Sequence, residues 1–288
     1  MGWICCSDVD EFIDKRGAAL TANESLYNLT WAAIHRSRET GPGTRGYTFL
    51  TFDEDPSSTA HAFIQNKTQH LVLSSMSASQ VTELLDFLNS QDIPLKEIEG
   101  PRAIALTAVH RWTEQPGRSY THKMKQGVYE LTRVNMPDLD DGKMVMAGPQ
   151  HKGLLQSFIT GFWRDCFPKE TVTTEQILAR VDRFINEQRA YLWCTQDGEV
   201  VSMAAVVRES PNATSISAVF TPRHHRGKGH AARIVATLSQ AQLDKGKSAC
   251  NLHTDLTNPT SNGVYIRIGY TQIGEGMRFR LFTADISK

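Results

Sequence analysis

The chain has 288 residues, of which 40% are hydrophobic and 22% are charged, and its formal net charge is zero. These values are typical of a globular protein with room for two domains of ordinary size. The zero net charge argues against a nucleic-acid or anionic-membrane partner, and no apolar run approaches the length that crosses a bilayer.

The N-terminal sequence and the cysteines bear on the compartment in which the protein works. The N-terminus lacks a basic region followed by a long apolar core, so we expect no signal peptide. Of the five scattered cysteines, Cys166, Cys194 and Cys250 lie in apolar segments and are expected to be reduced core residues. We therefore expect a cytoplasmic protein with no membrane association.

The first half of the chain, residues 1–134, predicts alternating helices and strands. The cap sequence Asn23–Ser25 predicts a helix that ends near the glycines at 41–43. Ser77 and Gln80 have the spacing of a capping box at the start of a later helix. The remaining predictions are strands over 47–52, 60–64 and 71–73, a turn over 53–58, a helix over 101–114 and a strand pair over 119–134.

The second half, residues 135–288, predicts the same succession of elements after an acidic linker over 136–142. Asp197-Gly198 between two apolar runs is a strong hairpin signal. Strands are predicted over 143–146, 191–194, 200–207, 216–221 and 249–254, and helices over 150–167, 174–188 and from about 231 to Gly246.

The two halves differ at one strand-to-helix turn. The second half has Arg-Gly-Lys-Gly at 226–229, and the first has Met-Ser-Ala-Ser-Gln at 76–80, without the glycines and the basic charge. We infer a duplicated fold whose first copy cannot hold a pyrophosphate. An unrelated α/β domain in the first half is the alternative interpretation.

The turn at 226–229 has the chemistry of an anion site. It follows an apolar strand over 216–221 and precedes a helix, whose first N–H groups lack partners and carry partial positive charge. Gly227 and Gly229 let the backbone approach a phosphate closely. Positive charge comes from Arg223, Arg226 and Lys228. The pattern predicts a pyrophosphate site, although the Walker and G-x-G-x-x-G fingerprints are absent.

Two motifs together resemble a known family. Residues 226–231 fill the pattern R-x-x-G-x-A, and residues 258–270 contain Asn258, Tyr265 seven positions later and a Gly-aromatic pair. This combination resembles the acetyl-CoA signature of the GNAT (Gcn5-related N-acetyltransferase) superfamily, over roughly residues 143–283. The whole chain resembles predicted two-domain acetyltransferases in which a degenerate GNAT-like domain precedes an intact one.

The resemblance implies a fold, a co-substrate and a set of site residues. The fold is of the α/β (α+β) class, with a mixed central sheet flanked by helices, in a degenerate domain over 1–134 and an intact catalytic domain over 135–288. The implied co-substrate is acetyl-CoA, with no metal. Tyr265 would protonate the leaving thiolate, and a β-bulge would splay the strand near 218–221. The implied cofactor contacts are Val219, Phe220, Thr221, Arg226, Gly227, Lys228, Gly229, His230, Ala231, Asn258 and Ser261.

Several of these residues allow a second interpretation. The basic turn could be a solvent-exposed helix cap, and Tyr265 could be a half-buried helix aromatic whose hydroxyl needs a partner. Ser261 could equally cap its helix or contact the pantetheine arm. The histidines at 224, 225, 230 and 253 suggest a metal, but the adjacent pair lacks a suitable ligand geometry, and we expect none.

The sequence supports three hypotheses for function. The first is an N-acetyltransferase that moves acetyl to a primary amine, in a small-molecule acceptor expected between the two halves, by direct attack in a ternary complex. The alternatives are an amino-acid N-acyltransferase of the glycine-conjugating type and a non-catalytic CoA-binding sensor. Glu209, His253 and Asp255 are candidates for a general base, and none is assigned. Nothing in the sequence identifies the acceptor or the oligomeric state.

Overall fold

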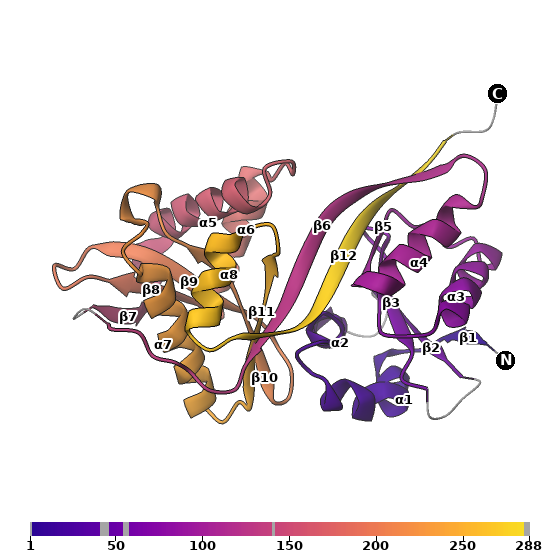
Figure 1. Ribbon diagram of the computed structural model, residues 1–288, viewed down its shortest axis with the longest axis horizontal. Helices are drawn as coiled ribbons and strands as arrows, with labels where there is room; N and C mark the ends of the chain where they lie inside the picture. The colour runs from indigo at the N-terminus through magenta and orange to yellow at the C-terminus, as the bar shows by residue number, and fades with distance from the viewer. Residues whose placement is uncertain (1, 41–45, 54–57, 140–141, 285–288) are drawn as a thin grey trace. The chain divides into compact units, whose positions relative to one another are not determined.

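The computed structural model describes residues 2–40, 46–53, 58–139 and 142–284, which separate into two units (Figure 1). The N-terminal unit contains the described residues of 1–128, 254–257 and 272–288, and the C-terminal unit contains 129–253 and 258–271. The helix end predicted at 41–43 and parts of the predicted turn and linker, at 54–57 and 140–141, lie outside the described residues.

The first half of the chain has the order strand, two helices, three strands, helix, strand, helix, strand. Its elements are β1 (Trp3–Cys5), α1 (Val9–Ala22), α2 (Asn28–Thr40), β2 (Tyr47–Phe52), β3 (His61–Gln65), β4 (His70–Leu73), α3 (Ala78–Ser90), β5 (Glu97–Pro101), α4 (Arg102–Thr113) and β6 (Arg118–Leu131). None of the described helices in either half is long and apolar enough to cross a membrane.

The second half repeats this order, with two short 3-10 turns added, so the predicted duplication is confirmed. Its elements are β7 (Lys143–Met146), η1 (Pro149–His151), α5 (Lys152–Cys166), α6 (Thr174–Asn186), β8 (Ala190–Cys194), β9 (Val200–Glu209), β10 (Ala213–Phe220), η2 (Arg223–His225), α7 (His230–Asp244), β11 (Ala249–Asp255), α8 (Pro259–Arg267) and β12 (Thr271–Thr283). The predicted hairpin at Asp197-Gly198 joins β8 and β9, which pair antiparallel.

The sequence analysis missed one helix, α1, and made three wrong predictions. The first concerns the predicted helix cap at Asn23–Ser25: Asn23 is the C-cap of α1, and α2 begins at Asn28. Helix α1 was not predicted, because its buried positions include the charged Arg16 between Phe12 and Leu20, which weakens the apolar stripe. The predicted strand pair over 119–134 is one continuous strand, β6, which runs on through Gly127. Cys166 is exposed at the end of α5, whereas Cys194 and Cys250 are buried as expected.

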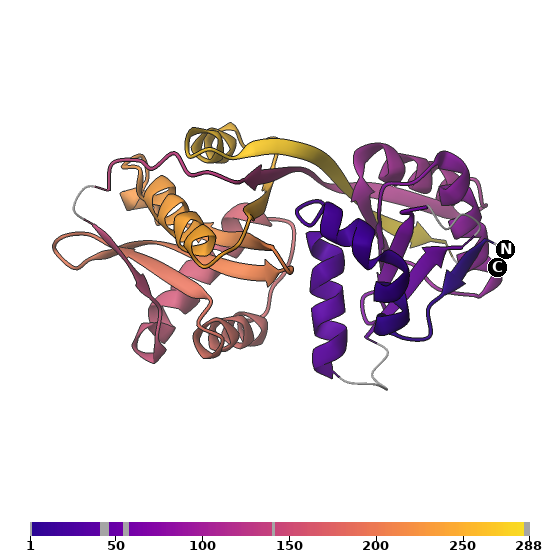
Figure 2. The same cartoon turned by 90° about the horizontal axis from the view of Figure 1, so that it is seen from below.

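In both units a mixed sheet lies between helices (Figure 2). In the N-terminal unit, side chains of neighbouring strand positions alternate: Phe49 packs with the cluster of α1 and α2, and Leu50 packs with the cluster of α3 and α4. In the C-terminal unit, α5 and α6 pack their apolar faces on Leu192, Met203 and Phe220 of β8, β9 and β10. The parallel pairs β4–β5 and β10–β11 are each joined by a helix, α3 or α7.

The last strand of the chain completes the sheet of the N-terminal unit. Strand β12 pairs antiparallel with β5, so that Arg278 lies opposite Glu99 and Arg280 opposite Glu97. Glu97 accepts hydrogen bonds from Lys123 on β6 at 2.9 Å and from Arg278 Nε at 2.7 Å. These contacts fix β12, which follows directly after α8, to the sheet of the first copy.

The charge of Glu97 is expected to contribute to stability. Burial alone would raise the pKa of Glu97, but the hydrogen bond from Lys123 and the charge of Arg278 outweigh burial and lower the pKa. Glu97→Gln leaves cations around a nearly buried site, and we expect the free energy of unfolding at pH 7 to fall by about 2 kcal/mol. Urea denaturation measures this difference.

The pH dependence gives a second readout of the same prediction. Because the pKa of Glu97 is depressed in the folded state, its contribution is complete above the unfolded-state pKa and is lost as the pH falls through the folded-state value. The stabilities of the wild type and Glu97→Gln should therefore converge in acid. The control Glu114→Gln removes an exposed partner of Arg111 and should change stability by less than about 1 kcal/mol. Equal effects of the two substitutions would contradict the prediction.

Candidate functional site

Strand β10 carries a bulge before the basic turn. Ser217 lies opposite Ala205 of β9 and Phe220 lies opposite Met203, so three steps along β10 match two along β9. The extra residue coincides with Ala218, whose φ is +52°. Parallel pairing of β10 with β11 covers Ala213–Ser215 only, before the bulge. The bulge that the resemblance implied is present, and it lies where the two parallel strands separate.

The end of β10 is in contact with side chains of β9 and α5. Ser202 of β9, fully buried, donates a hydrogen bond from Oγ to the Phe220 carbonyl at 3.1 Å and lies 2.9 Å from Thr221 Oγ1. The Phe220 ring packs against Phe158 of α5, with centroids 5.6 Å apart. Val219, between the bulge and Phe220, is half-buried. The Phe220 carbonyl, the Phe220 ring and the Thr221 hydroxyl therefore all have partners where the backbone leaves the sheet.

Close packing between α5 and Phe220 gives a testable consequence. A Cβ at Gly161 of α5 would collide with the Phe220 ring. We expect Gly161→Ala to lower the free energy of unfolding by about 1–3 kcal/mol, because the ring must move. The control Gly153→Ala lies on the same helix with open space around it and should be neutral or stabilising. Thermal unfolding of both variants measures the difference, and an unchanged Gly161→Ala protein would contradict this packing.

The basic turn adopts a backbone that favours glycine. Gly227 has a φ of +79° and Gly229 a φ of +82°, in the left-handed region that other residues rarely occupy. Gly229 is the N-cap of α7, and no side chain hydrogen-bonds at this cap. The first turn of α7, beginning with the buried His230 and the half-buried Ala231, therefore has backbone N–H groups that no capping side chain covers.

The corresponding helix start in the first copy, that of α3, is covered by capping side chains. Helix α3 begins with a capping box, in which Ser77 Oγ accepts from Gln80 N at 3.2 Å and Gln80 Oε1 accepts from Ser77 N at 2.9 Å. Strands β4 and β5 also stay close together, because a Cβ at Gly100 would lie 2.9 Å from Leu73 Cβ. The first copy thus lacks both the open helix N-terminus and the separated strands.

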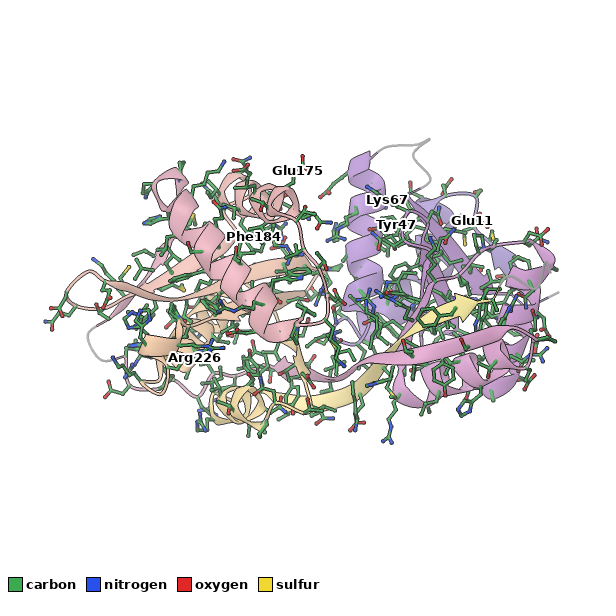
Figure 3. All side chains as sticks on the ribbon, turned by 90° about the horizontal axis from the view of Figure 1, so that it is seen from above. Glu11, Tyr47, Lys67, Glu175, Phe184 and Arg226 are labelled. Atoms are coloured by element: carbon green, nitrogen blue, oxygen red, sulfur yellow. The ribbon has the colours of Figure 1, made fainter. Side chains whose placement is uncertain are left out.

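Arg226 is partly exposed, and its side chain connects the turn to the end of α5. Its Nε donates to the Thr221 carbonyl at 2.8 Å, and its Nη2 lies 2.5 Å from Asp165 Oδ2 at the end of α5. The guanidinium also lies over the Phe220 ring, 5.7 Å from its centroid. Figure 3 shows Arg226 in the C-terminal unit, among the side chains of this region.

Arg233, on the first turn of α7, was not predicted as part of the site. It donates from Nη1 to the Lys228 carbonyl at 2.7 Å and from Nε to the Asp138 carbonyl at 2.7 Å. Helical side chains lean towards the N-terminus, so a long basic side chain four residues after Gly229 can reach back over the turn. That spacing is the signal through which the sequence could have identified Arg233.

The histidines of the turn belong to local packing. The rings of His224 and His225 lie 4.1 Å apart, and His225 Nε2 lies 3.3 Å from a Glu199 carboxylate oxygen. Within the described ranges, no group of three or more His, Cys, Asp and Glu residues is placed to hold a metal ion.

The second motif forms the start of α8. Asn258 is the N-cap, and its Oδ1 accepts from the backbone N of Ser261 at 3.1 Å. Ser261 thus takes part in the cap through its main chain, and the cap uses only the side-chain oxygen of Asn258. Tyr265 follows about two turns later, and its ring centroid lies 6.1 Å from that of the buried Tyr270.

The surroundings of Tyr265 keep its hydroxyl protonated. Although the residue retains some exposed surface, burial raises the pKa of the Tyr265 hydroxyl well above its usual range, and the charge of a Cys166 thiolate would raise it further. The end of α5 is close to both motifs: Asp165 pairs with Arg226 of the first motif, and Cys166, the next residue, is near Tyr265 of the second. The hydroxyl is therefore in its protonated form at neutral pH, and it is not available there as a phenolate base.

Two of the three candidate bases make contacts that fix the local structure. Asp255 Oδ1 accepts from the backbone N and the Oγ1 of Thr257, each at 2.8 Å, which fixes the turn before Asn258. Glu209 pairs with Arg189 at 3.5 Å. His253 is half-buried on β11.

Comparison with known proteins places these features in a family context. Residues 194–279 match the model of the family described as FR47-like protein, and this segment contains both motifs. The sequence matches no functionally curated protein.

Solved structures share the fold over almost the whole chain. A Drosophila protein is 14% identical, with 97% of this chain and 98% of that chain covered and a TM-score of 0.67. A GCN5-related N-acetyltransferase from Sphaerobacter thermophilus is 17% identical, with 96% and 95% covered and a TM-score of 0.59. A tandem GNAT protein from the clavulanic acid biosynthesis pathway is 8% identical, with 99% of both chains covered and a TM-score of 0.51. The chain therefore has the GNAT fold in two successive copies, which confirms the resemblance to the GNAT superfamily indicated by the two motifs.

Proposed function

We propose that this protein transfers the acetyl group of acetyl-CoA to a primary amine of a small molecule. The observation that carries the proposal is the open N-terminus of α7 beside the bulged end of β10, present in the second copy and closed in the first. On this proposal, residues 135–288 form the catalytic domain and residues 1–134 a degenerate copy. The cysteines are all free, which supports a reducing, cytoplasmic compartment.

The turn fits the pyrophosphate of a CoA thioester. Backbone N–H groups at the start of α7 and the positive end of its dipole favour an anion, and the glycines remove the Cβ atoms that would obstruct it. Lys228 adds positive charge at the exposed edge. The pantetheine arm would lie along 218–221, where β10 separates from β11, with Asn258 at its side.

The chemistry requires one bond to form and one to break. The neutral amine nitrogen attacks the acyl carbon directly, the carbon–sulfur bond breaks, the amine releases a proton to water, and the thiolate takes a proton. Tyr265 is the proposed donor of that proton, since its hydroxyl is held protonated. Backbone N–H groups at the bulge are the proposed donors to the carbonyl oxygen as negative charge develops there.

An acyl-transfer assay tests the proposal against its two rivals. Purified protein is incubated with acetyl-CoA or benzoyl-CoA and a panel of small primary amines that includes glycine, and released CoA thiol is measured. The proposal expects amine-dependent release with acetyl-CoA. Release with benzoyl-CoA and glycine alone would support the amino-acid N-acyltransferase, and tight acetyl-CoA binding without release for any amine would support the sensor.

A further inference from the structure

The carboxylate of Asp165 and the guanidinium of Arg226 form an ion pair between the end of α5 and the basic turn, 61 positions apart in the chain. The Nη2–Oδ2 distance is 2.5 Å, and the exposed fractions of the side chains are 20% for Asp165 and 46% for Arg226. Arg164 Nε lies 3.2 Å from the other oxygen of Asp165. Both carboxylate oxygens are therefore engaged by cations.

Arg226 makes two further contacts, both with the residues at the end of β10. Its Nε donates to the Thr221 carbonyl, and its guanidinium lies over the Phe220 ring. The same residues, Phe220 and Thr221, are anchored from the other side by Ser202. A series of contacts thus connects β9 to α5: Ser202 contacts Phe220 and Thr221, and Arg226 contacts these two residues and Asp165.

Because the Arg226 side chain is bound to Asp165 and Thr221, it can hold the backbone of residues 226–229 in one position. Both glycines in that segment gain conformational freedom from the lack of a Cβ, so an unanchored turn would sample many backbone states. A site made of backbone N–H groups binds an anion well only when those groups already point in the right direction. Two side chains outside the glycines limit the turn: Arg233 donates to the Lys228 carbonyl at 2.7 Å, and Arg226 links the start of the turn to Asp165.

We infer that Asp165 is a positioning residue for the cofactor turn: through its pair with Arg226 it holds the backbone of 226–231 in the anion-binding conformation without contacting the ligand. This inference rests on the proposed function for its consequence in acetyl-CoA binding, but the ordering of the turn is a property of the free protein. Burial would raise the pKa of Asp165, and the hydrogen bonds from Arg226 and Arg164 outweigh it and lower the pKa, in keeping with a carboxylate that stays charged in the pair.

The test combines a measurement without ligand and one with acetyl-CoA. In the free protein, hydrogen–deuterium exchange of the peptide spanning 221–231 is compared between the wild type and Asp165→Asn, and we expect exchange about tenfold faster in the variant. Calorimetric titration with acetyl-CoA should show a dissociation constant about tenfold higher for Asp165→Asn, with unfolding temperature nearly unchanged. The charge-swapped double variant, Asp165→Arg with Arg226→Asp, should recover part of the loss seen in Asp165→Arg alone.

A matched control removes a different ion pair of the same helix. Lys152, at the start of α5, pairs with Asp182 at 2.5 Å, and Asp182→Asn should leave both the exchange of 221–231 and acetyl-CoA affinity unchanged. Unchanged exchange in Asp165→Asn would overturn the inference whether or not the protein binds acetyl-CoA. Tighter acetyl-CoA binding by Asp165→Asn would also overturn it, because the carboxylate would then compete with phosphate for Arg226. Faster exchange in a protein that binds no acetyl-CoA would support the positioning role and count against the proposed function alone.

Discussion

Gly229→Asp is expected to abolish measurable acetyl-CoA binding while leaving the fold intact. The new carboxylate would stand at the N-terminus of α7, where the dipole and the uncovered N–H groups attract it in place of a phosphate. A like charge against the incoming pyrophosphate costs several kcal/mol, so the affinity should fall at least about 100-fold. Calorimetric titration measures this loss, and circular dichroism during thermal unfolding checks the fold.

Two controls separate charge from backbone strain. Gly229→Asn introduces a neutral side chain of similar size at the same φ of +82°, and it should retain part of the affinity. Gly246→Asp places the same residue at a φ of +92° beyond the other end of α7, with nothing within 4 Å, and it should bind acetyl-CoA normally. If Gly229→Asp bound as tightly as Gly246→Asp, the helix N-terminus would not be the phosphate site.

Tyr265→Phe is expected to lower the transfer rate by about 100-fold or more without weakening acetyl-CoA binding. The substitution removes only the hydroxyl that the proposal uses as proton donor, and the ring that packs near Tyr270 remains. Because burial raises the pKa of Tyr265, the wild-type rate should not fall with deprotonation of this group near the usual tyrosine value. Steady-state rates and binding constants are measured on the same preparations.

Tyr270→Phe is the matched control for Tyr265→Phe. The Tyr270 hydroxyl lies 2.9 Å from Ser239 Oγ in the core, so its loss should lower the free energy of unfolding by about 1 kcal/mol and leave turnover unchanged. A full rate in Tyr265→Phe would remove the hydroxyl from the chemistry and leave the tyrosine as a packing residue.

Local sequence patterns predicted much of the fold, because caps and turns depend on near neighbours. Ser77 and Gln80 make the capping box that their spacing indicated, and α7 ends before Gly246, whose φ is +92°. The two glycines of the basic turn have the positive φ that makes glycine useful there. The absence of a second anion turn in the first copy also followed from residues 76–80, whose side chains cover the start of α3.

What the sequence missed depends on contacts between distant residues. Nothing near Asp165 indicates that it meets Arg226, because the pair forms only when α5 packs on the end of β10. The pairing of β12 with β5 is equally non-local, since any strand of suitable polarity could occupy that sheet position. Cys166 was misassigned because an apolar neighbourhood in sequence does not reveal which face of a helix end is covered.

Titration of the unaltered protein with acetyl-CoA, followed by calorimetry, tests the central claim most directly. The account predicts saturable binding with a stoichiometry of one per chain, because the glycine turn before α7 leaves that helix start without a capping side chain, whereas the equivalent start of α3 is closed by its capping box. The double variant Arg226→Glu with Gly229→Asp should show no binding. Absence of binding by the unaltered protein, or a stoichiometry of two, would contradict the account.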